Sequence, residues 1–449
     1  MRLQRAHGPP TTEIAVFVRL AKHAWPAALI GAWLIAAPAS AQLARGLGGA
    51  VGGLPSTLGG VVNGTVGGLR QRVDQTLDDV TSTATDLSRD RLGDLARAHP
   101  KALELDDSGA VVVRGEVLAI SPTVASLDLT AKAGFSVLRE NRLDSLGLDL
   151  VTLGTPKGLS AREALRRLRA LDPQGRYDLD HLYAGAGESL AAIGAEAGAG
   201  AGATANGAGG RIGLLDTGID GKHPAFAASD IDQRGFAPGG VTPAAHGTAV
   251  ASLIVGQAHG FRGSAPGARL LAADVYGAGP TGGSADAIVQ GLAWMAENHV
   301  RVINISLVGP PNLTLEASVR ALIERGVLIV APVGNDGPAA PPLYPAAYPG
   351  VVAVTGVDRR GKALIEAGRA GHVDFAAPGA DLEAARPGGG FAKVRGTSFA
   401  APIVAGRLAE AIHGDDRAAT SRALAALTDQ ARQAGGVVGR DIALADQAH

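Results

Sequence analysis

Short apolar runs alternate with longer amphipathic segments from residue 211 onward. Apolar runs of about four to eight residues are typical of buried strands, and apolar positions three or four apart are typical of helices. The pattern predicts strands at 212–215, 270–275, 300–307, 327–330 and 351–357. It predicts helices at 246–255, 285–298, 315–325, 398–412 and 421–433. Apolar strands alternating with helices indicate an α/β fold, in which a mostly parallel sheet carries helices on both faces.

A smaller α+β unit is predicted at residues 100–183. Its pattern gives a strand pair or one long strand at 111–120, strands at 148–153 and 177–183, and helices at 127–146 and 160–171. Ser121-Pro122 ends the first strand, because proline has no backbone N–H to donate. The order strand, helix, strand, helix, strand favours a split βαβ, ferredoxin-like layer.

Glycine-rich segments flank this unit. Residues 42–99 begin with repeated Gly-Gly pairs up to Gly68, which predict a flexible segment. They continue with a helix at 69–98, either continuous or broken near Thr81–Thr85. Residues 184–210 are nearly all Ala and Gly, the composition of a linker. We therefore expect the α/β domain to occupy residues 211–449.

The first segment, residues 1–41, predicts export. Basic residues precede an apolar run at 24–37, and Ala39-Ser40-Ala41 offers small residues for cleavage. These are the parts of a secretory signal peptide. A transmembrane anchor is the alternative, but the run is short and contains Pro26. We expect a periplasmic or secreted protein with no membrane association after signal cleavage.

Composition narrows the function classes. The formal net charge is −1, so there is no global electrostatic case for binding nucleic acid or an anionic membrane. The chain has no cysteine, which excludes disulfides, thiol catalysis and cysteine metal sites. With 46% hydrophobic but only 4% aromatic residues, the core must consist mainly of Ala, Val, Leu and Ile.

Four polar residues are expected at strand ends or helix starts of the α/β domain. Asp216 closes the first strand, His246 and Ser398 open helices, and Asn335 follows a strand. Sites in such sheets form at the carboxyl ends of the strands. A serine hydroxyl attacks well when a base removes its proton, and the base works best when a carboxylate orients it. A side-chain amide can donate to the oxyanion of a tetrahedral intermediate.

These residues stand within five motifs that resemble those of the subtilase family. The motifs are Leu215-Asp216-Thr217-Gly218-Ile219, His246-Gly247-Thr248, Asn304-Ile305-Ser306-Leu307, Gly334-Asn335 and Gly396-Thr397-Ser398-Phe399-Ala400-Ala401-Pro402. The resemblance covers most of residues 211–412 and implies a subtilisin-like serine endopeptidase that works through an acyl-enzyme. It implies that Asp216 is the orienting acid, His246 the general base and Ser398 the nucleophile. Asn335 and the Ser398 N–H would be the oxyanion donors.

The resemblance also implies a precursor. Residues 100–183 resemble, more weakly, the family's inhibitory propeptide, which assists folding and is then cleaved off by the enzyme itself. By this resemblance the propeptide ends near His181-Leu182-Tyr183, with cleavage after Tyr183. We expect protein or peptide substrates, the propeptide as an intramolecular inhibitor, no nucleic-acid partner and a monomer.

The family's substrate-binding walls correspond here to Ser306, Leu307, Val308, Pro332, Val333 and Gly334. Val308 stands where the family usually has glycine, and Pro332 lies in what is usually a run of small residues. We predict a narrowed pocket that favours small residues before the scissile bond. A narrow pocket conflicts with cleavage after Tyr183, so either the walls splay apart or cleavage occurs within 184–210.

No cofactor or metal is expected. The segment 256–263 lies where many family members carry a calcium loop, yet it has no carboxylate, and calcium prefers several oxygen ligands. Calcium sites elsewhere stay open.

Three other interpretations compete with the serine protease. Asp107-Ser108-Gly109 and Asp216-Thr217-Gly218 are the triplets of an aspartic protease, but that pairing gives Ser398 no role. A metal hydrolase built on His223, His246 and Asp216 lacks helical ligand spacing. An exported binding protein on a subtilase scaffold would usually lack a triad residue, and all three are present here. We expect His223 and His259 at the surface or in turns.

Overall fold

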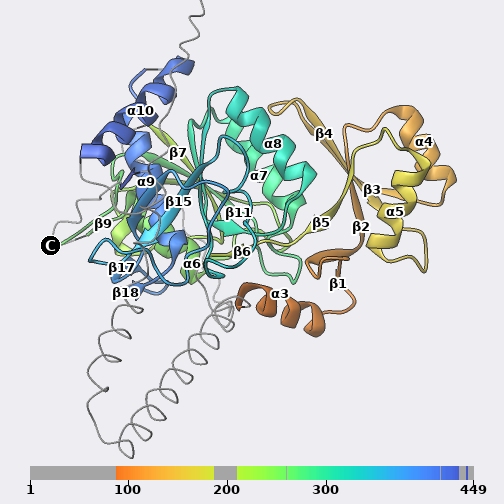
Figure 1. Cartoon of the computed structure of the whole chain (residues 1–449), viewed down its shortest axis with the longest axis horizontal. Coiled ribbons are helices and arrows are strands. Elements are labelled where there is room, and N and C mark those ends of the chain that lie inside the picture. Colours follow the sequence, from red (N-terminus) through yellow and green to blue (C-terminus); the bar gives the residue numbers. More distant parts are fainter. Residues whose placement is uncertain (1–86, 187–209, 259, 415, 434–440, 443–449) are drawn as a thin grey trace, which may run out of the picture. The chain divides into compact units, whose positions relative to one another are not determined.

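Figure 1 shows the chain as a computed structural model, which describes residues 87–186, 210–258, 260–414, 416–433 and 441–442. These residues all belong to one compact unit, residues 77–449. The predicted signal segment 1–41 and most of the predicted linker, 187–209, lie outside the described residues. So do residues 42–86, which include the Gly-rich segment and the first part of the helix predicted at 69–98.

A parallel sheet forms the centre of the α/β domain, with strand order β19-β16-β15-β14-β12-β7-β11-β8. Its strands are β7 (Arg211–Asp216), β8 (Asp230–Gly235), β11 (Arg269–Asp274), β12 (Val302–Ile305), β14 (Leu328–Pro332), β15 (Val352–Val357), β16 (Phe375–Pro378) and β19 (Asp441–Ile442). The mostly parallel sheet predicted from the alternation of strands and helices is confirmed.

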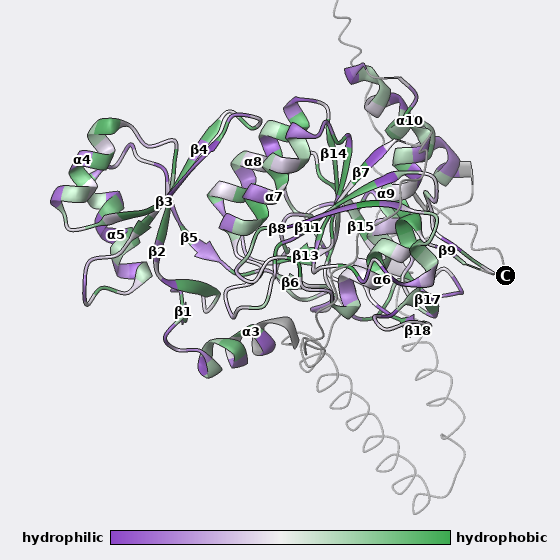
Figure 2. Ribbon diagram, turned by 180° about the vertical axis from the view of Figure 1, so that it is seen from behind, coloured by the Kyte–Doolittle hydropathy of each residue, from purple (hydrophilic) through white to green (hydrophobic). Residues whose placement is uncertain are grey.

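Helices cover both faces of this sheet. They are α6 (Ala245–Val255), α7 (Ala285–Glu297), α8 (Leu313–Glu324), α9 (Thr397–Ala411) and α10 (Arg417–Gln433). Along β7, Ile212 and Leu214 join the hydrophobic core shared with α6 and α9, whereas Leu215 joins the core shared with α7 and α8. Successive side chains of a strand point to opposite faces, so the two cores lie on opposite sides of the sheet. Figure 2 shows hydrophilic and hydrophobic residues along both α7 and α8, and α7 is buried over most of its length.

Several strands of the α/β domain differ from the prediction. The strand expected at 300–307 is divided into β12 and β13 (Leu307–Val308), and β13 pairs with β6 (Ala184–Gly185) outside the main sheet. Strand β8 was not predicted, because its sequence Asp-Ile-Asp-Gln-Arg-Gly has no apolar run and it lies at a sheet edge. The hairpins β9–β10 (Gln257–Ala258, Phe261–Arg262) and β17–β18 (Leu382–Ala385, Phe391–Val394) also lack an apolar signal.

The N-terminal unit begins with α3 (Leu87–Ala98) and β1 (Leu103–Leu105). It continues with β2 (Val111–Ile120), α4 (Val124–Lys132), β3 (Ser136–Leu143), β4 (Leu148–Gly154), α5 (Ala161–Leu171) and β5 (Tyr177–His181). Strand β2 pairs with β4 and β5, β4 pairs with β3, and every pairing is antiparallel. Residues from α4 and α5 share a core with one face of the sheet.

The helix predicted at 127–146 is wrong in its second half. Helix α4 ends at Lys132, Gly134 takes a positive φ of 89°, and the chain then forms strand β3. Strand β3 is the edge of the sheet and is exposed over most of its length, so no alternation of buried apolar positions marks it in the sequence.

The second face of the N-terminal sheet contacts the α/β domain. Leu118, Leu143 and Leu150 belong to the same hydrophobic core as Leu292 of α7. Ser145 donates a hydrogen bond from its hydroxyl to the carbonyl of Ala293, at 3.0 Å. This contact brings the end of β5, and the residues that follow it, to the carboxyl edge of the parallel sheet.

Candidate active site

The four polar residues predicted for the site come from four separate elements. Asp216 is the last residue of β7, His246 lies in the first turn of α6, and Ser398 lies in the first turn of α9. Asn335 follows β14 by three residues. The parallel sheet brings Asp216 and Asn335 to the edge at which α6 and α9 begin.

His246 stands between Asp216 and Ser398. Its Nδ1 lies 2.8 Å from Oδ1 and 2.9 Å from Oδ2 of Asp216, and its Nε2 lies 2.9 Å from Oγ of Ser398. An ionised carboxylate can only accept, so Nδ1 carries the proton and donates it, and Nε2 accepts from the serine hydroxyl. The exposed fractions of the three residues are 0% for Asp216, 1% for His246 and 0% for Ser398. The arrangement can move a proton from the hydroxyl to the imidazole away from bulk water.

The loop after Asp216 holds helix α6 in place. The hydroxyl of Thr217 accepts a hydrogen bond from the N–H of Gly247 at 2.9 Å. A Cβ on Gly247 would lie 2.2 Å from the carbonyl oxygen of Thr217, closer than real Cβ contacts. Glycine next to His246 therefore allows the two backbones to approach, and this approach sets the distance from His246 to Asp216.

The side chain of Asn335 is oriented by the start of α9. Its Oδ1 accepts a hydrogen bond from the N–H of Thr397 at 3.0 Å. Because an amide has its oxygen and nitrogen on opposite sides, this bond turns Nδ2 away from Thr397. Among the residues that the structure describes, the buried Nδ2 has no hydrogen-bond partner. A buried donor without a partner is costly and rare in native structures, so this one is available to a group that arrives in the site.

The predicted substrate-binding residues lie on two buried segments beside Ser398. Ser306, Leu307 and Val308 lead into and form β13, while Pro332 ends β14 and Val333-Gly334 continues from it. Ser306 accepts from the Nδ2 of Asn304 at 2.7 Å and donates from its hydroxyl to the carbonyl of Ser398 at 3.1 Å. The sequence motif contained Asn304 but gave it no role, and the structure shows that it fixes the Ser306 hydroxyl.

The chain's own residues 184–186 occupy this site. Ala184 and Gly185, predicted as linker, form β6 and pair antiparallel with Val308 and Leu307. Ala186 donates its N–H to the carbonyl of Ser306 at 3.3 Å, and its carbonyl accepts from the N–H of Ser398 at 3.2 Å. Strand β6 pairs through its backbone, which any residue type can do. The Ala and Gly composition of this segment therefore gave no sign that it forms a strand.

The rival interpretations find no support in the geometry. The side chain of Asp107 is 64% exposed and pairs with Arg166 at 2.6 Å, whereas Asp216 is fully buried. The two carboxyl groups therefore do not share one site, as an aspartic protease requires. His223 was predicted at the surface or in a turn; it is buried, and it lies in the turn that leads into the 3-10 helix Pro224–Phe226. Its Nδ1 accepts from the N–H of Ala225 at 3.1 Å and its Nε2 donates to the carbonyl of Gly390 at 2.8 Å, so neither nitrogen is available to a metal. His259 lies outside the described residues.

A model of the subtilase family matches residues 207–441, slightly more than half of the chain. The chain belongs to the subtilase family. Subtilases are serine endopeptidases, and this subtilase is one. It is 39% identical to Subtilisin Savinase from Lederbergia lenta over 212 residues, which cover 45% of this chain and 76% of the relative. It is 34% identical to Subtilisin E from Bacillus subtilis (strain 168) over 213 residues, which cover 44% of this chain and 54% of the relative.

A solved structure extends the likeness in fold. Fervidolysin from Fervidobacterium pennivorans, described as a keratinolytic enzyme related to subtilisin, aligns with a TM-score of 0.61 at 20% identity. The alignment covers 77% of this subtilase and 62% of fervidolysin. Identity at this level shows a shared fold.

Proposed function

We propose that this subtilase hydrolyses peptide bonds with Ser398 as nucleophile, His246 as general base and Asp216 as the group that orients His246. The observation that carries the proposal is the position of His246, which reaches Asp216 at 2.8 Å and Ser398 at 2.9 Å through its two ring nitrogens. The carboxylate fixes the tautomer that leaves Nε2 as a base and stabilises the imidazolium that forms.

The reaction proceeds in two halves. Ser398 Oγ attacks the carbonyl carbon of the substrate while its proton moves to Nε2 of His246, which then protonates the leaving amine. Water attacks the resulting acyl-enzyme, with His246 again as the base. The charge on the tetrahedral oxygen is stabilised by the N–H of Ser398 and by Nδ2 of Asn335. These donors are in place before the reaction begins, which is the condition for effective electrostatic stabilisation.

We also propose that the N-terminal unit inhibits the enzyme as an intramolecular propeptide. Two acidic residues of β5 bind the starts of two helices of the enzyme domain. Asp178 accepts from the N–H of Leu313 at 2.6 Å, at α8, and Asp180 accepts from the N–H of Asp286 at 3.0 Å, at α7. Helix starts have unpaired backbone N–H groups, so a side-chain oxygen that accepts from one of them in the docked state satisfies a donor that burial would otherwise leave without a partner. Residues 184–186 then block the site in the manner of a substrate.

The cellular context follows from the sequence. We infer that residues 1–41 direct export, that the precursor processes itself, and that the mature enzyme is a monomer acting on protein or peptide substrates. In the part of the chain that the structure describes, no helix is both long and apolar enough to cross a membrane.

We further propose that segment 256–263 holds no calcium. Gly263 donates its N–H to the carbonyl of Gly256 at 2.8 Å, and strands β9 and β10 pair within this segment. Backbone pairing of this kind uses the carbonyl groups that a calcium loop would offer as ligands. Among the described residues, no cluster of three or more His, Cys, Asp or Glu side chains is placed to hold a metal ion.

The test compares the wild-type chain with Ser398→Ala after expression of the full precursor. The wild type should shorten itself and hydrolyse casein, and Ser398→Ala should do neither while keeping the same circular dichroism spectrum and melting transition as the uncleaved chain. Cleavage of casein by Ser398→Ala would refute the mechanism. A folded wild type that neither shortens itself nor reacts with a fluorophosphonate would favour a binding protein on a subtilase scaffold.

A further inference from the structure

Helix α3, strand β1 and the turn that follows them, residues 87–110, precede the β2-α4-β3-β4-α5-β5 order of the N-terminal unit. We propose that these residues form a clasp, which keeps the N-terminal unit on the enzyme by holding His181 and Leu182, where β5 ends and the chain continues to the active site. Opening of the clasp would then precede release of the unit and the start of activity. The inference rests on the proposed inhibition and adds the element that controls how long it lasts.

Leu182 belongs to the hydrophobic core of the clasp. It is 0% exposed and shares this small core with residues of α3, β1 and β2, namely Ala96, Leu103, Val111 and Val113. Its N–H also donates to the carbonyl of Val111 at 2.9 Å. On the enzyme side, Leu182 forms an antiparallel bridge with Ser284, the N-cap of α7. Leu182 is therefore bound by the clasp on one side and by the enzyme on the other.

Strand β1 supports the interrupted part of the pairing between β2 and β5. Residues Val117–Ala119 of β2 pair with β5, the register then shifts, and beyond the shift only Val112 pairs, with His181. Such a shift breaks the ladder of backbone hydrogen bonds. Strand β1 pairs with residues 111–113 from the opposite edge of β2. The part of β2 that holds the end of β5 is thus fixed by the clasp and not by a continuous ladder.

Hydrogen bonds run from the clasp through His181 to the enzyme. Nε2 of His181 donates to Oδ2 of Asp106 at 3.2 Å, and Nδ1 accepts from Nδ2 of Asn312, the N-cap of α8, at 3.0 Å. Partial burial would raise the pKa of Asp106, but hydrogen bonds from His181 and from the turn at 108–110 lower this pKa to about 2. Asp106 is therefore an ionised acceptor, and it selects the tautomer of His181 whose Nδ1 can bind Asn312.

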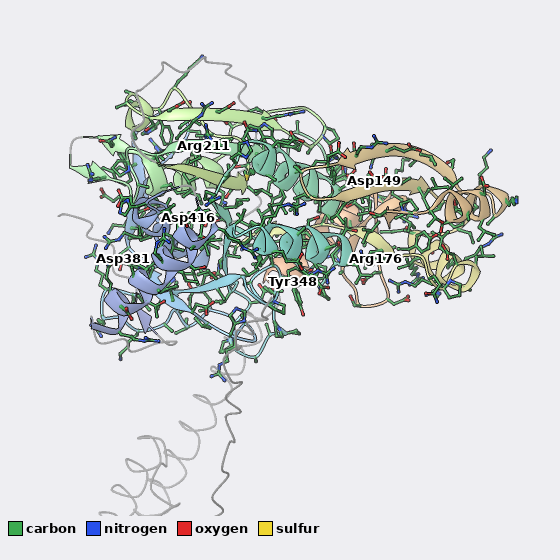
Figure 3. The ribbon with its side chains drawn as sticks, turned by 90° about the horizontal axis from the view of Figure 1, so that it is seen from above. Asp149, Arg176, Arg211, Tyr348, Asp381 and Asp416 are labelled. Atoms are coloured by element: carbon green, nitrogen blue, oxygen red, sulfur yellow. The ribbon has the colours of Figure 1, made fainter. Side chains whose placement is uncertain are left out.

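Asn312 is fixed in the orientation that His181 needs. Its Oδ1 accepts from the N–H groups of Thr314 and Leu315 at 3.0 and 3.1 Å, so Nδ2 is directed at the N-terminal unit. Its backbone is bonded to Tyr348, labelled in Figure 3, whose hydroxyl accepts from the N–H of Asn312 and donates to its carbonyl, both at 2.9 Å. The enzyme side of this contact is thus firmly placed, and the clasp decides whether His181 meets it.

The first experiment measures hydrogen exchange in the uncleaved Ser398→Ala precursor, so it does not depend on catalysis. Leu103→Ala removes a buried side chain of the clasp, and Asp106→Asn removes the charged acceptor of His181. We expect the amides of residues 182–186 to exchange about 10- to 100-fold faster in Leu103→Ala and about threefold to tenfold faster in Asp106→Asn. The amides of β4 and α5 should change by a smaller factor in both variants, because their own core does not include the clasp.

Leu168→Ala is the matched control. Leu168 is as buried as Leu103, but it lies in the other hydrophobic core of the N-terminal unit, with residues of β4 and α5. This substitution should speed exchange in β4 and α5 at least as much as at 182–186. If Leu103→Ala gives the same pattern as Leu168→Ala, or leaves exchange at 182–186 unchanged, the clasp is not a separate lock and the proposal is wrong.

A reversible lock tests the order of the steps. The register pairs Leu105 of β1 with Val111 of β2, next to the hydrogen bond from the N–H of Asp106 to the carbonyl of Ala110. Residues paired beside such a bond approach closely enough for a disulfide, and the chain has no cysteine of its own. We therefore combine Leu105→Cys with Val111→Cys in the otherwise wild-type precursor. The delay between self-cleavage and the onset of peptide hydrolysis should be at least about threefold longer before reduction than after it. Equal delays in the two redox states would show that the unit leaves with the clasp closed, and would overturn the proposal.

The two proposals fail separately in these experiments. Self-cleavage and casein hydrolysis by the wild type test the protease mechanism, whereas hydrogen exchange tests the clasp in a chain that cannot cleave. A wild type that passes the activity tests, with clasp variants that exchange like Leu168→Ala, refutes the clasp alone. A wild type without activity, with clasp variants that open selectively at 182–186, supports the clasp and refutes the protease mechanism.

Discussion

Two substitutions of Asn335, to Ala and to Asp, should rank in opposite order for kcat and for Tm. The side chain of Asn335 has two separate tasks in the structure. Oδ1 accepts from the N–H of Thr397 at 3.0 Å, while Nδ2 is buried and, among the described residues, has no partner. Asn335→Ala removes both groups. Asn335→Asp keeps an acceptor for Thr397 and replaces the donor by a negatively charged oxygen.

The magnitudes follow from these contacts. Loss of the corresponding donor in a subtilisin lowers kcat by roughly 10²–10³, which is about 2.7–4 kcal/mol. The N–H of Ser398 remains in both variants, so activity should not disappear. In Asn335→Ala the buried N–H of Thr397 also loses its acceptor, at a cost of about 1–3 kcal/mol in the free energy of unfolding. In a domain of this size that lowers Tm by roughly 2–12 °C.

We therefore expect kcat to fall in the order wild type, Ala, Asp, because the aspartate repels the developing oxyanion. We expect Tm to fall less in Asp than in Ala, because a carboxylate at the start of α9 keeps the bond to Thr397 and interacts favourably with the helix dipole. The assay is steady-state hydrolysis of a chromogenic peptide by matured enzyme, together with thermal unfolding of each variant in the Ser398→Ala background. A KM change with kcat within about fivefold of the wild type would refute the reasoning.

Three further predictions concern pH, packing and metal. Burial and the charge of Asp286 raise the pKa of Asp180 well above 3.8, so docking of the N-terminal unit takes up a proton. That contribution to stability is complete below pH 3.8 and is lost as pH rises through the raised pKa. We therefore expect the Tm of Ser398→Ala, Asp180→Asn to rise relative to the Tm of Ser398→Ala alone as pH increases from 4. A Tm difference between the two proteins that stays constant with pH would contradict this. Gly247→Ala places a Cβ 2.2 Å from the carbonyl oxygen of Thr217. It should lower the free energy of unfolding, measured in urea, by about 1–3 kcal/mol, and it should lower kcat because His246 is displaced. An unchanged kcat would show that this contact does not position the base. With no carboxylate in segment 256–263, EDTA should leave Tm unchanged, and a fall of more than about 5 °C, equivalent to roughly 2 kcal/mol, would reveal a calcium site.

The sequence predicted the α/β domain well because its strands are buried on both faces. Strands such as β7 and β15 read as continuous apolar runs and were located within a residue or two. Edge elements were missed for the opposite reason. Strands β3 and β8 are exposed or half-exposed, so their polar residues carry no periodic signal, and β3 was assigned to a helix.

The residues of the site also divide into those that a sequence motif reveals and those that it does not. Short motifs with glycine neighbours led to Asp216, His246, Ser398 and Asn335, which the structure brings together. Tyr276 carried no motif, because its contribution is a hydroxyl directed at the backbone of residue 183, and only the three-dimensional path of the chain reveals it. The same holds for β6, where Ala and Gly bind through their backbone.

The most direct test of the mechanism is the site and rate of fluorophosphonate labelling in the matured enzyme. The mechanism predicts one adduct, located on Ser398 by mass spectrometry of the digested protein. It also predicts that His246→Ala, labelled as the uncleaved chain after the N-terminal unit has been released in mild denaturant, reacts at least about 100-fold more slowly, because general-base assistance typically contributes 10²–10⁴. An adduct on another residue, or equal labelling rates with and without His246, would contradict the triad.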